Sequence, residues 1–192
     1  MDRLLDELNR RRPWLLAIAG IPGSGKSTLA GELARRIPGA VLVPMDGYHV
    51  PRASLTPDQM VRRGAPDTFD SLALRRDLQR LRENREGQFP AFDHAVKDPE
   101  PGAITVPSSA SLVIVEGLYL LLKDWNLADL FDMTVFLNCD MPTALDRVAA
   151  RHLTSGLVTT LEEGRERANT IDRRHAELIL ADGCRERANL IL

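Results

Sequence analysis

Nine consecutive residues near the amino terminus have the composition of a phosphate-binding loop. Residues 20–28 read GIPGSGKST and match the pattern G-x-x-x-x-G-K-[ST]. Glycines let backbone amides turn toward a phosphate, Lys26 supplies a compact positive charge, and the Ser27 hydroxyl suits Mg²⁺. The predicted phosphate-binding residues are therefore Gly20, Ile21, Pro22, Gly23, Ser24, Gly25, Lys26, Ser27 and Thr28.

Two carboxylates follow later apolar runs and could act beside this loop. Asp46 comes directly after the run AVLVPM, and Glu116 follows the run LVIV. Because ligands of parallel sheets bind at the carboxyl ends of the strands, both side chains are expected near the phosphates. We predict Asp46 as a general base for a substrate hydroxyl and Glu116 as a residue that holds Mg²⁺ or polarises the nucleophile. Structural turns at Asp46-Gly47 and Glu116-Gly117 remain the alternatives.

A phosphate loop predicts nucleotide binding but leaves the use of the phosphate open. The sequence contains no N-K-x-D segment, which argues against a GTPase. We therefore predict a kinase that requires ATP and Mg²⁺ and transfers the γ-phosphate to a hydroxyl of a small metabolite, with Lys26 and Asp46 as catalytic residues. A nucleotide-dependent switch or slow ATPase that regulates without an acceptor is the alternative.

The elements that must position these residues alternate along the chain. Strands are expected at 14–19, 40–45, 112–115 and 133–138, with an edge strand at the end, because each is a short apolar run. Helices are expected at 26–36, at 71–86 with Gly87 as its cap, and at 142–153. This alternation predicts an α/β fold of three layers, with a mostly parallel central sheet and helices on both faces. The 192 residues are predicted to form one domain.

Residues 87–107 interrupt this alternation. The segment is rich in proline and contains the short strand-like pieces FPAF and AITV. These features predict a hairpin or an excursion over the edge of the sheet, and we expect it to touch the substrate.

Six segments, in their order along the chain, resemble the phosphoribulokinase, uridine kinase and bacterial pantothenate kinase group of P-loop kinases. They are GIPGSGKST, MDGYH, RRGAPDTFD, FDHAVKDP, VIVEGLYLL and RVAARHL, and the resemblance extends over nearly the whole chain from Trp14 onward. It implies that Asp46 is the catalytic base and that Glu116 lies by the metal. It also implies a small helical lid, at about 147–175, in which Arg147 and Arg151 contact the nucleotide phosphates. Arg151 is thereby a third predicted catalytic residue. Arginine suits that task because its planar guanidinium binds phosphate oxygens in pairs, although a solvated helix face is the alternative for Arg151.

The resemblance leaves the acceptor open. Gly64-Ala65 stands where uridine kinases usually carry an acidic residue, RGAPDTFD is closer to pantothenate kinases, and the short chain resembles small bacterial sugar or fructose-transport kinases. Sugar, pantothenate-like and nucleoside acceptors therefore all remain. The residues expected to line the acceptor pocket are Tyr48, His49, Arg63, Asp93, His94 and Lys97, with a surface hairpin position as the alternative for His94.

Composition narrows the class of partner. All but three of the 25 basic residues are arginine, yet the net charge is -2, which argues against a general nucleic-acid binder. No apolar run reaches the ~18 residues of a spanning helix, and the amino terminus lacks a secretory pattern. Cys139 and Cys184 have no metal or disulfide spacing. We expect a cytoplasmic protein with a small-molecule acceptor and without nucleic-acid or membrane partners, and a homodimer is left open.

Overall fold

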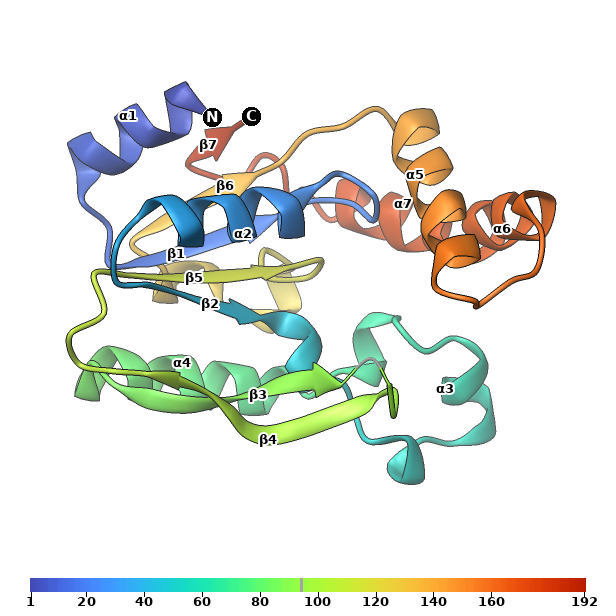
Figure 1. Ribbon diagram of the computed structural model, residues 1–192, viewed down its shortest axis with the longest axis horizontal. Helices are drawn as coiled ribbons and strands as arrows, with labels where there is room; N and C mark the ends of the chain where they lie inside the picture. The colour runs from blue at the N-terminus through green and yellow to red at the C-terminus, as the bar shows by residue number, and fades with distance from the viewer. Residues whose placement is uncertain (94) are drawn as a thin grey trace.

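The central sheet has five strands in the order β2-β5-β1-β6-β7, and each pair of neighbours runs parallel. A computed structural model describes residues 1–93 and 95–192 (Figure 1). The strands are β1 (Leu15–Ala19), β2 (Ala40–Pro44), β5 (Leu112–Gly117), β6 (Met133–Phe136) and β7 (Leu190–Ile191). The expected strands, including the edge strand at the end of the chain, are therefore confirmed.

Helices cover both faces of this sheet. Figure 1 shows α1 (Asp2–Arg11) and α2 (Lys26–Arg36) on one side and α4 (Ser71–Asn84) on the other. Strand β1 is buried on both faces, because Leu16 and Ile18 pack in the cluster with α1 and α2, whereas Leu15 and Ala17 pack in the cluster with α4. The predicted three layers and mostly parallel sheet are confirmed.

Strands β3 (Gly87–Asp93) and β4 (Asp98–Val106) form the hairpin predicted over 87–107. They are antiparallel, and their register shifts between Phe89 and Ala91, where Pro90 has no N–H to donate. The hairpin packs against the 3₁₀ turn η1 (Met45–Tyr48) that follows β2. A Cβ at Gly47 would overlap the Pro90 carbonyl group, so glycine permits this close approach.

The segment between η1 and α4 consists of short elements that the sequence did not predict. They are the 3₁₀ turn η2 (Arg52–Ser54), helix α3 (Pro57–Val61) and the 3₁₀ turn η3 (Pro66–Thr68). Helix α3 begins with a capping box, in which the Thr56 side chain accepts from the Gln59 backbone and the Gln59 side chain accepts from Thr56. The 3₁₀ turns η4 (Lys123–Trp125) and η5 (Ala128–Leu130) join β5 to β6.

The end of α4 differs from the prediction. Helix α4 ends at Asn84, and Arg85 rather than Gly87 adopts the left-handed conformation of the cap, with φ of 62°. Its backbone N–H donates to the Leu81 carbonyl, and its guanidinium lies over the Trp14 ring at 3.7 Å from the centroid. Contact with the aromatic ring offsets the cost of the left-handed backbone, which leaves Gly87 free to begin β3.

The segment predicted as a lid, at about 147–175, begins within α5 (Met141–Thr154) and ends within α7 (Arg173–Ala181). Between them lie α6 (Leu161–Arg167) and the π-helical segment η6 (Ala168–Asp172), and these four elements together are called the lid below. In Figure 1 these helices form a group at the carboxyl end of the sheet, on the side of β1 and β6. Among the described residues, no helix is long and apolar enough to cross a membrane.

Replacing Gly47 by alanine tests the contact between η1 and the hairpin. The new methyl group would push against the Pro90 carbonyl, and we expect Gly47→Ala to lower the free energy of unfolding by about 1–3 kcal/mol. Gly31→Ala is the matched control, because a Cβ at Gly31 in α2 has open space around it. The free energy of unfolding of that variant, measured by urea denaturation, should rise by about 0.5–1 kcal/mol. Equal stability of the two variants would contradict the close packing at Gly47.

Candidate functional site

The glycines of the phosphate loop are required by both conformation and space. Gly23 and Gly25 have φ of 77° and 96°, which side chains rarely adopt. A Cβ at Gly23 would overlap the carbonyl oxygen of Ala144 in α5. A Cβ at Gly20 would lie 2.7 Å from the Ser24 Oγ atom and 2.8 Å from the backbone oxygen of Leu137, after β6. The loop is therefore packed between β6 and α5.

The same loop opens at the amino end of α2. The first backbone N–H groups of a helix have no partner within the helix, and the helix dipole makes this end positive. Helix α2 has no side-chain cap, since Gly25 stands at its N-cap position, and the Ser24 hydroxyl has no hydrogen-bond partner among the described residues. Unpaired donors at the amino end of a helix are what a bound phosphate requires.

Lys26, Ser27 and Glu116 meet below the loop. Strand pairing aligns Ile18 of β1 with Glu116 of β5, which brings the start of α2 beside the end of β5. Lys26 and Glu116 are 8% and 7% exposed, and the Ser27 hydroxyl donates to Glu116 Oε1 at 3.1 Å. Burial lowers the pKa of the Lys26 ammonium, and the negative charge of Glu116 acts in the opposite direction. Burial likewise raises the pKa of the Glu116 carboxyl, against the effect of Lys26.

The oxygen atoms of this cluster fit a hard divalent cation. Glu116 Oε2 is buried and has no hydrogen-bond partner within the described part of the chain. A carboxylate oxygen and a hydroxyl are ligands that Mg²⁺ accepts, and it commonly takes only one or two protein ligands when phosphates supply others. No group of three or more His, Cys, Asp or Glu that could hold a metal occurs among residues 1–93 and 95–192. Ser27 and Glu116 are residues whose oxygen atoms could hold Mg²⁺.

Asp46 lies beside this cluster, at the end of the neighbouring strand. The register aligns Pro44 of β2 with Glu116 of β5, and Asp46 follows two residues later in η1. A Cβ at Gly117 would overlap the Met45 side chain, so η1 packs directly on the end of β5. Asp46 is partly exposed. Its negative charge opposes the effect of burial on the pKa of Lys26 and adds to the effect of burial on the pKa of Glu116. The structure thus brings Asp46 together with Lys26 and Glu116.

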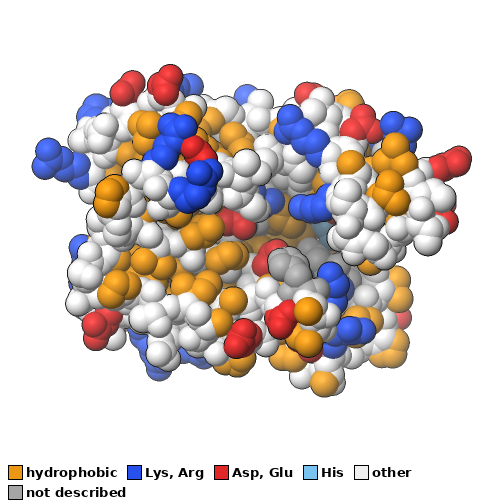
Figure 2. Space-filling model, in the orientation of Figure 1, with side chains coloured by type: hydrophobic (Ala, Val, Ile, Leu, Met, Phe, Trp, Pro, Cys, Tyr) orange, Lys and Arg blue, Asp and Glu red, His pale blue; other side chains and the backbone are white. Residues whose placement is uncertain are grey.

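Two arginines of α5 face the loop from the lid. Arg147, Arg151, Gly23, Gly25, Lys26, Ser27 and Thr28 line a cavity of about 300 Å³. Arg147 Nη1 donates to the Gly23 carbonyl at 3.5 Å. Figure 2 shows the surface hollowed between the lid and the part of the molecule that contains α3, with basic and acidic side chains in the hollow. The cavity thus has cations on two sides, Lys26 at its floor and the arginines on its lid side.

His49 follows Asp46 by three residues, and aromatic rings hold it in place. It stacks on Phe69, with 4.0 Å between ring centroids and 25° between ring planes, and it lies 5.0 Å from the Phe92 ring. Burial lowers the pKa of the His49 imidazole, while the Asp46 carboxylate acts in the opposite direction. Its Nδ1 atom is buried and has no partner among the described residues.

Arg63 joins the segment containing α3 to the hairpin. Its Nη2 atom donates to Asp98 Oδ1 at 2.9 Å and to the Val50 carbonyl at 3.3 Å, and Nη1 donates to the Lys97 carbonyl. Asp98 Oδ1 also accepts from the Arg52 backbone N–H at 2.9 Å. Arg63 is therefore paired with Asp98, and its clearest role is to hold the segment containing α3 against the hairpin.

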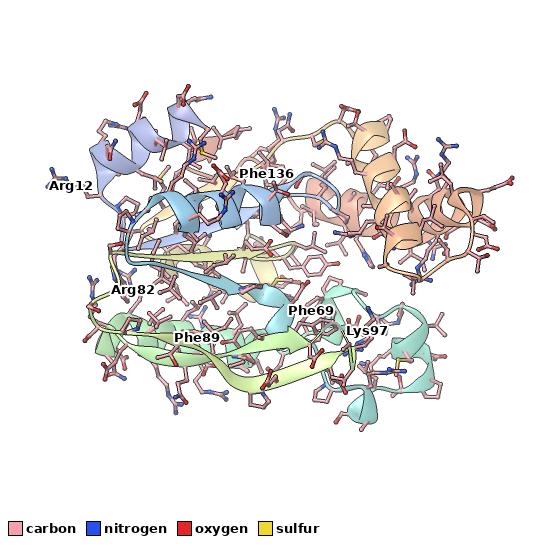
Figure 3. The ribbon with its side chains drawn as sticks, viewed as in Figure 1. Arg12, Phe69, Arg82, Phe89, Lys97 and Phe136 are labelled. Carbon is pink, nitrogen blue, oxygen red and sulfur yellow. The ribbon has the colours of Figure 1, made fainter. Side chains whose placement is uncertain are left out.

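The remaining predicted acceptor residues are less well placed. The Tyr48 hydroxyl donates to Asp77 Oδ2 in α4 at 3.0 Å, so it serves packing in the core. Asp93 Oδ1 accepts from the backbone of Ala95 at 2.6 Å and closes the hairpin turn. Lys97 is exposed at the hairpin tip with φ of 60° (Figure 3). The prediction for His94 lies outside the described residues.

Tyr119 is a residue that the sequence did not single out. Its side chain is fully buried, and its hydroxyl donates to the Gly64 carbonyl at 2.7 Å. It makes edge contacts with Phe69 at 5.7 Å and with His175 of α7 at 6.4 Å. Because Tyr119 stands only three residues after Glu116, its place in the run VEGLYLL was the sequence signal that it lies near the site. Its hydrogen-bond partner Gly64 is 55 residues away along the chain, so the contact itself had no local signal.

Comparisons with known proteins agree with this geometry. Residues 16–172 match the family described as AAA domain (AAA_18). The chain is 37% identical over 188 residues to the Schizosaccharomyces pombe protein named "Putative uridine kinase", which covers 89% of this chain and 80% of the relative. It is 39% identical over 149 residues to the "ATP-dependent kinase-like protein notR'" of Aspergillus versicolor, covering 71% of this chain and 87% of the relative. The crystal structure of a "putative fructose transport system kinase" from Silicibacter sp. TM1040 superposes with a TM-score of 0.88 at 32% identity, over 99% of this chain and 97% of that chain.

Gly23→Ala tests the packing of the phosphate loop. We expect this variant to bind nucleotide at least about tenfold more weakly in calorimetric titration, because the methyl group would displace the loop from α5. Gly156→Ala is the control, since Gly156 also has a left-handed backbone, with φ of 69°, but a Cβ there meets no atom within 4 Å. That variant should lose about 1–2 kcal/mol of stability and keep its affinity. Equal affinity losses in the two variants would show that strain alone is responsible.

Proposed function

The chain belongs to the P-loop kinases related to uridine kinases, and from this premise we propose that it transfers the γ-phosphate of ATP to a hydroxyl of a small metabolite, with Asp46 as general base. The observation that carries the proposal is the meeting of Lys26, Glu116 and Asp46 at the carboxyl ends of three neighbouring strands. A cation for the phosphates, a carboxylate for a metal and a second, partly exposed carboxylate are thereby within interaction distance of one another.

The phosphate side of the reaction needs positive charge fixed in advance. Lys26 and the backbone amides at the start of α2 would bind the β- and γ-phosphates, and Arg147 and Arg151 would neutralise the charge of the transferred group from the lid. Burial of Lys26 strengthens its attraction for an anion, because few water molecules compete in the buried site.

Ser27 and Glu116 are the proposed ligands of Mg²⁺. When bound, the ion would neutralise charge on the phosphate oxygens. Without a cation, the Glu116 carboxylate relies on Lys26 and on one hydrogen bond from Ser27. Its unpartnered Oε2 atom supports the assignment, since buried carboxylate oxygens normally have a partner.

Asp46 is the proposed base because it is a carboxylic residue that is partly exposed and lies next to Lys26 and Glu116. A carboxylate there can accept the proton of the acceptor hydroxyl and orient its oxygen for in-line attack. His49 follows three residues later and carries a buried, unpartnered ring nitrogen that could bind a second polar group of the acceptor. Rings stacked around His49 would keep it fixed while the acceptor binds.

The acceptor is proposed to be a sugar, a pantothenate-like compound or a nucleoside. Relatives named for uridine and for fructose transport support hydroxylated metabolites as a class. We further propose that residues 1–192 act as one kinase domain with a lid at about 147–175, in the cytoplasm and without nucleic-acid or membrane partners. A homodimer remains compatible with this proposal.

An acceptor panel separates this proposal from a slow ATPase or switch. ADP release should rise when the true acceptor is added to the enzyme with ATP and Mg²⁺, and a coupled assay across nucleosides, pantothenate, hexoses and other vitamins would identify it. A switch would release ADP at the same slow rate with every compound. Detection of a phosphorylated product by mass spectrometry would then exclude the switch.

Asp46→Asn tests the proposed base. The amide keeps the shape of the side chain but cannot take a proton, so we expect kcat to fall by about 10²–10⁴ while the affinity for ATP stays close to that of the wild type. Asp70→Asn is the matched control, because Asp70 accepts from the Ala73 backbone as the N-cap of α4 and asparagine caps helices equally well. Unchanged turnover in Asp46→Asn would overturn the assignment of the base.

A further inference from the structure

The lid contains a buried polar pair that the proposed reaction does not use. His152 Nε2 and Asp172 Oδ2 are 2.9 Å apart, and both residues are 9% exposed. His152 comes from α5 and Asp172 from the end of η6, so the pair joins the first helix of the lid to the later ones. A buried carboxylate without its partner is costly, which makes such a pair sensitive to geometry.

The apolar core of the lid is too small to fix its helices alone. Its buried members are Leu145, Val148 and Ala149 from α5 and Ala168 from η6. Helix α5 and helix α6 approach closely, since a Cβ at Gly164 would lie 2.7 Å from the Ala149 carbonyl oxygen. Apolar contacts of this kind bring α5 and α6 together without selecting one relative position of the two helices. A directional hydrogen bond between the helices does select one.

His152 and the phosphate-facing arginines lie on different faces of α5. At about 100° per residue, His152 shares a face with Leu145, Val148 and Ala149, while Arg151 and Arg147 project about 100° and about 140° away from His152. The rotation of α5 about its own axis therefore determines both whether His152 reaches Asp172 and whether Arg147 and Arg151 point toward the cavity.

The partner helix is shaped to present Asp172. Gly164, Ala168, Asp172 and Ala176 are all buried and four residues apart. In a regular α-helix, four residues rotate the side-chain direction by one full turn plus about 40°, so residues spaced in this way gradually leave the buried face. The π-helical segment has more residues per turn, which reduces this rotation and keeps the four residues on one face. The Thr170 hydroxyl donates to the Glu166 carbonyl at 2.9 Å and occupies a backbone acceptor in this segment.

The same helix continues to the acceptor side. After Asp172, α7 carries His175, whose ring meets Tyr119, and Tyr119 donates to the Gly64 carbonyl. The pair therefore links α5, with its arginines, to a helix that already rests on the wall of the acceptor site.

We propose that His152 and Asp172 are positioning residues for the phosphoryl transfer. Their hydrogen bond holds α5 at the rotation that directs Arg151 to the cavity above Lys26, with the lid anchored on Tyr119 through α7. This inference rests on the proposed role of Arg151, so its test includes a variant of that arginine.

Two amides of different reach test the bond. The glutamine of His152→Gln places an N–H donor at about the position of Nε2, so kcat should stay within about threefold of the wild type. The shorter asparagine of His152→Asn cannot reach Asp172. That variant should lower kcat about ten- to a hundredfold, as expected when a catalytic group is displaced. The KM for the acceptor should change little. Thermal unfolding of each variant is measured alongside, and kinetics are compared well below the lower midpoint.

A double-mutant cycle distinguishes positioning from simple loss of stability. In an Arg151→Ala background, His152→Asn should cause no further loss of kcat, because the group it positions is gone. Asp172→Ala provides a second route to the same loss if His152→Asn folds poorly, because alanine has no oxygen that could accept from His152. Normal kcat in both His152→Asn and Asp172→Ala with a slow Arg151→Ala would overturn the positioning role and leave the proposed function intact. Normal kcat in Arg151→Ala would overturn both the role of that arginine and the positioning proposal.

Discussion

The buried charges of Lys26 and Glu116 are the interaction on which the arrangement of the site depends. Removing both charges from water is expensive, and their attraction repays the cost only if strand register brings them close. The parallel pairing of β1 with β5 provides that register, and the pairing of β2 with β5 adds Asp46 to the same edge. Such a buried pair contributes little to stability by itself, which is consistent with its proposed use in binding phosphate and metal.

Glycines at the contacts around this cluster allow close approach. The loop at Gly23 meets the backbone of α5, the turn at Gly47 meets the backbone of the hairpin, and Gly117 meets the Met45 side chain. The lid, the hairpin and the end of the sheet are thus packed against one another at positions where a larger residue would not fit.

Local signals in the sequence were enough to predict the strands of the sheet and to place the phosphate loop and Asp46 at its carboxyl edge. Strands such as Leu15–Ala19 are continuous apolar runs, and the residues of the loop are consecutive, so neither depends on distant contacts. The pairs His152–Asp172, Arg63–Asp98 and Tyr119–Gly64 could not be predicted, because their partners are 20, 35 and 55 residues apart. The cap of α4 was assigned wrongly for the same reason, since Arg85 gains its compensation from Trp14, far away in the chain.

The scarcity of lysine gives the burial of Lys26 a practical meaning. Lys97 and Lys123 are exposed, and the other basic side chains, apart from histidine, are arginines, which react poorly with amine-directed reagents. Lys26 is 8% exposed and lines the cavity, so access to its amine passes through the phosphate-binding loop. A reagent small enough to enter the cavity would therefore meet one amine whose access differs from that of the other two lysine side chains, and covalent modification of Lys26 would register the occupancy of the loop.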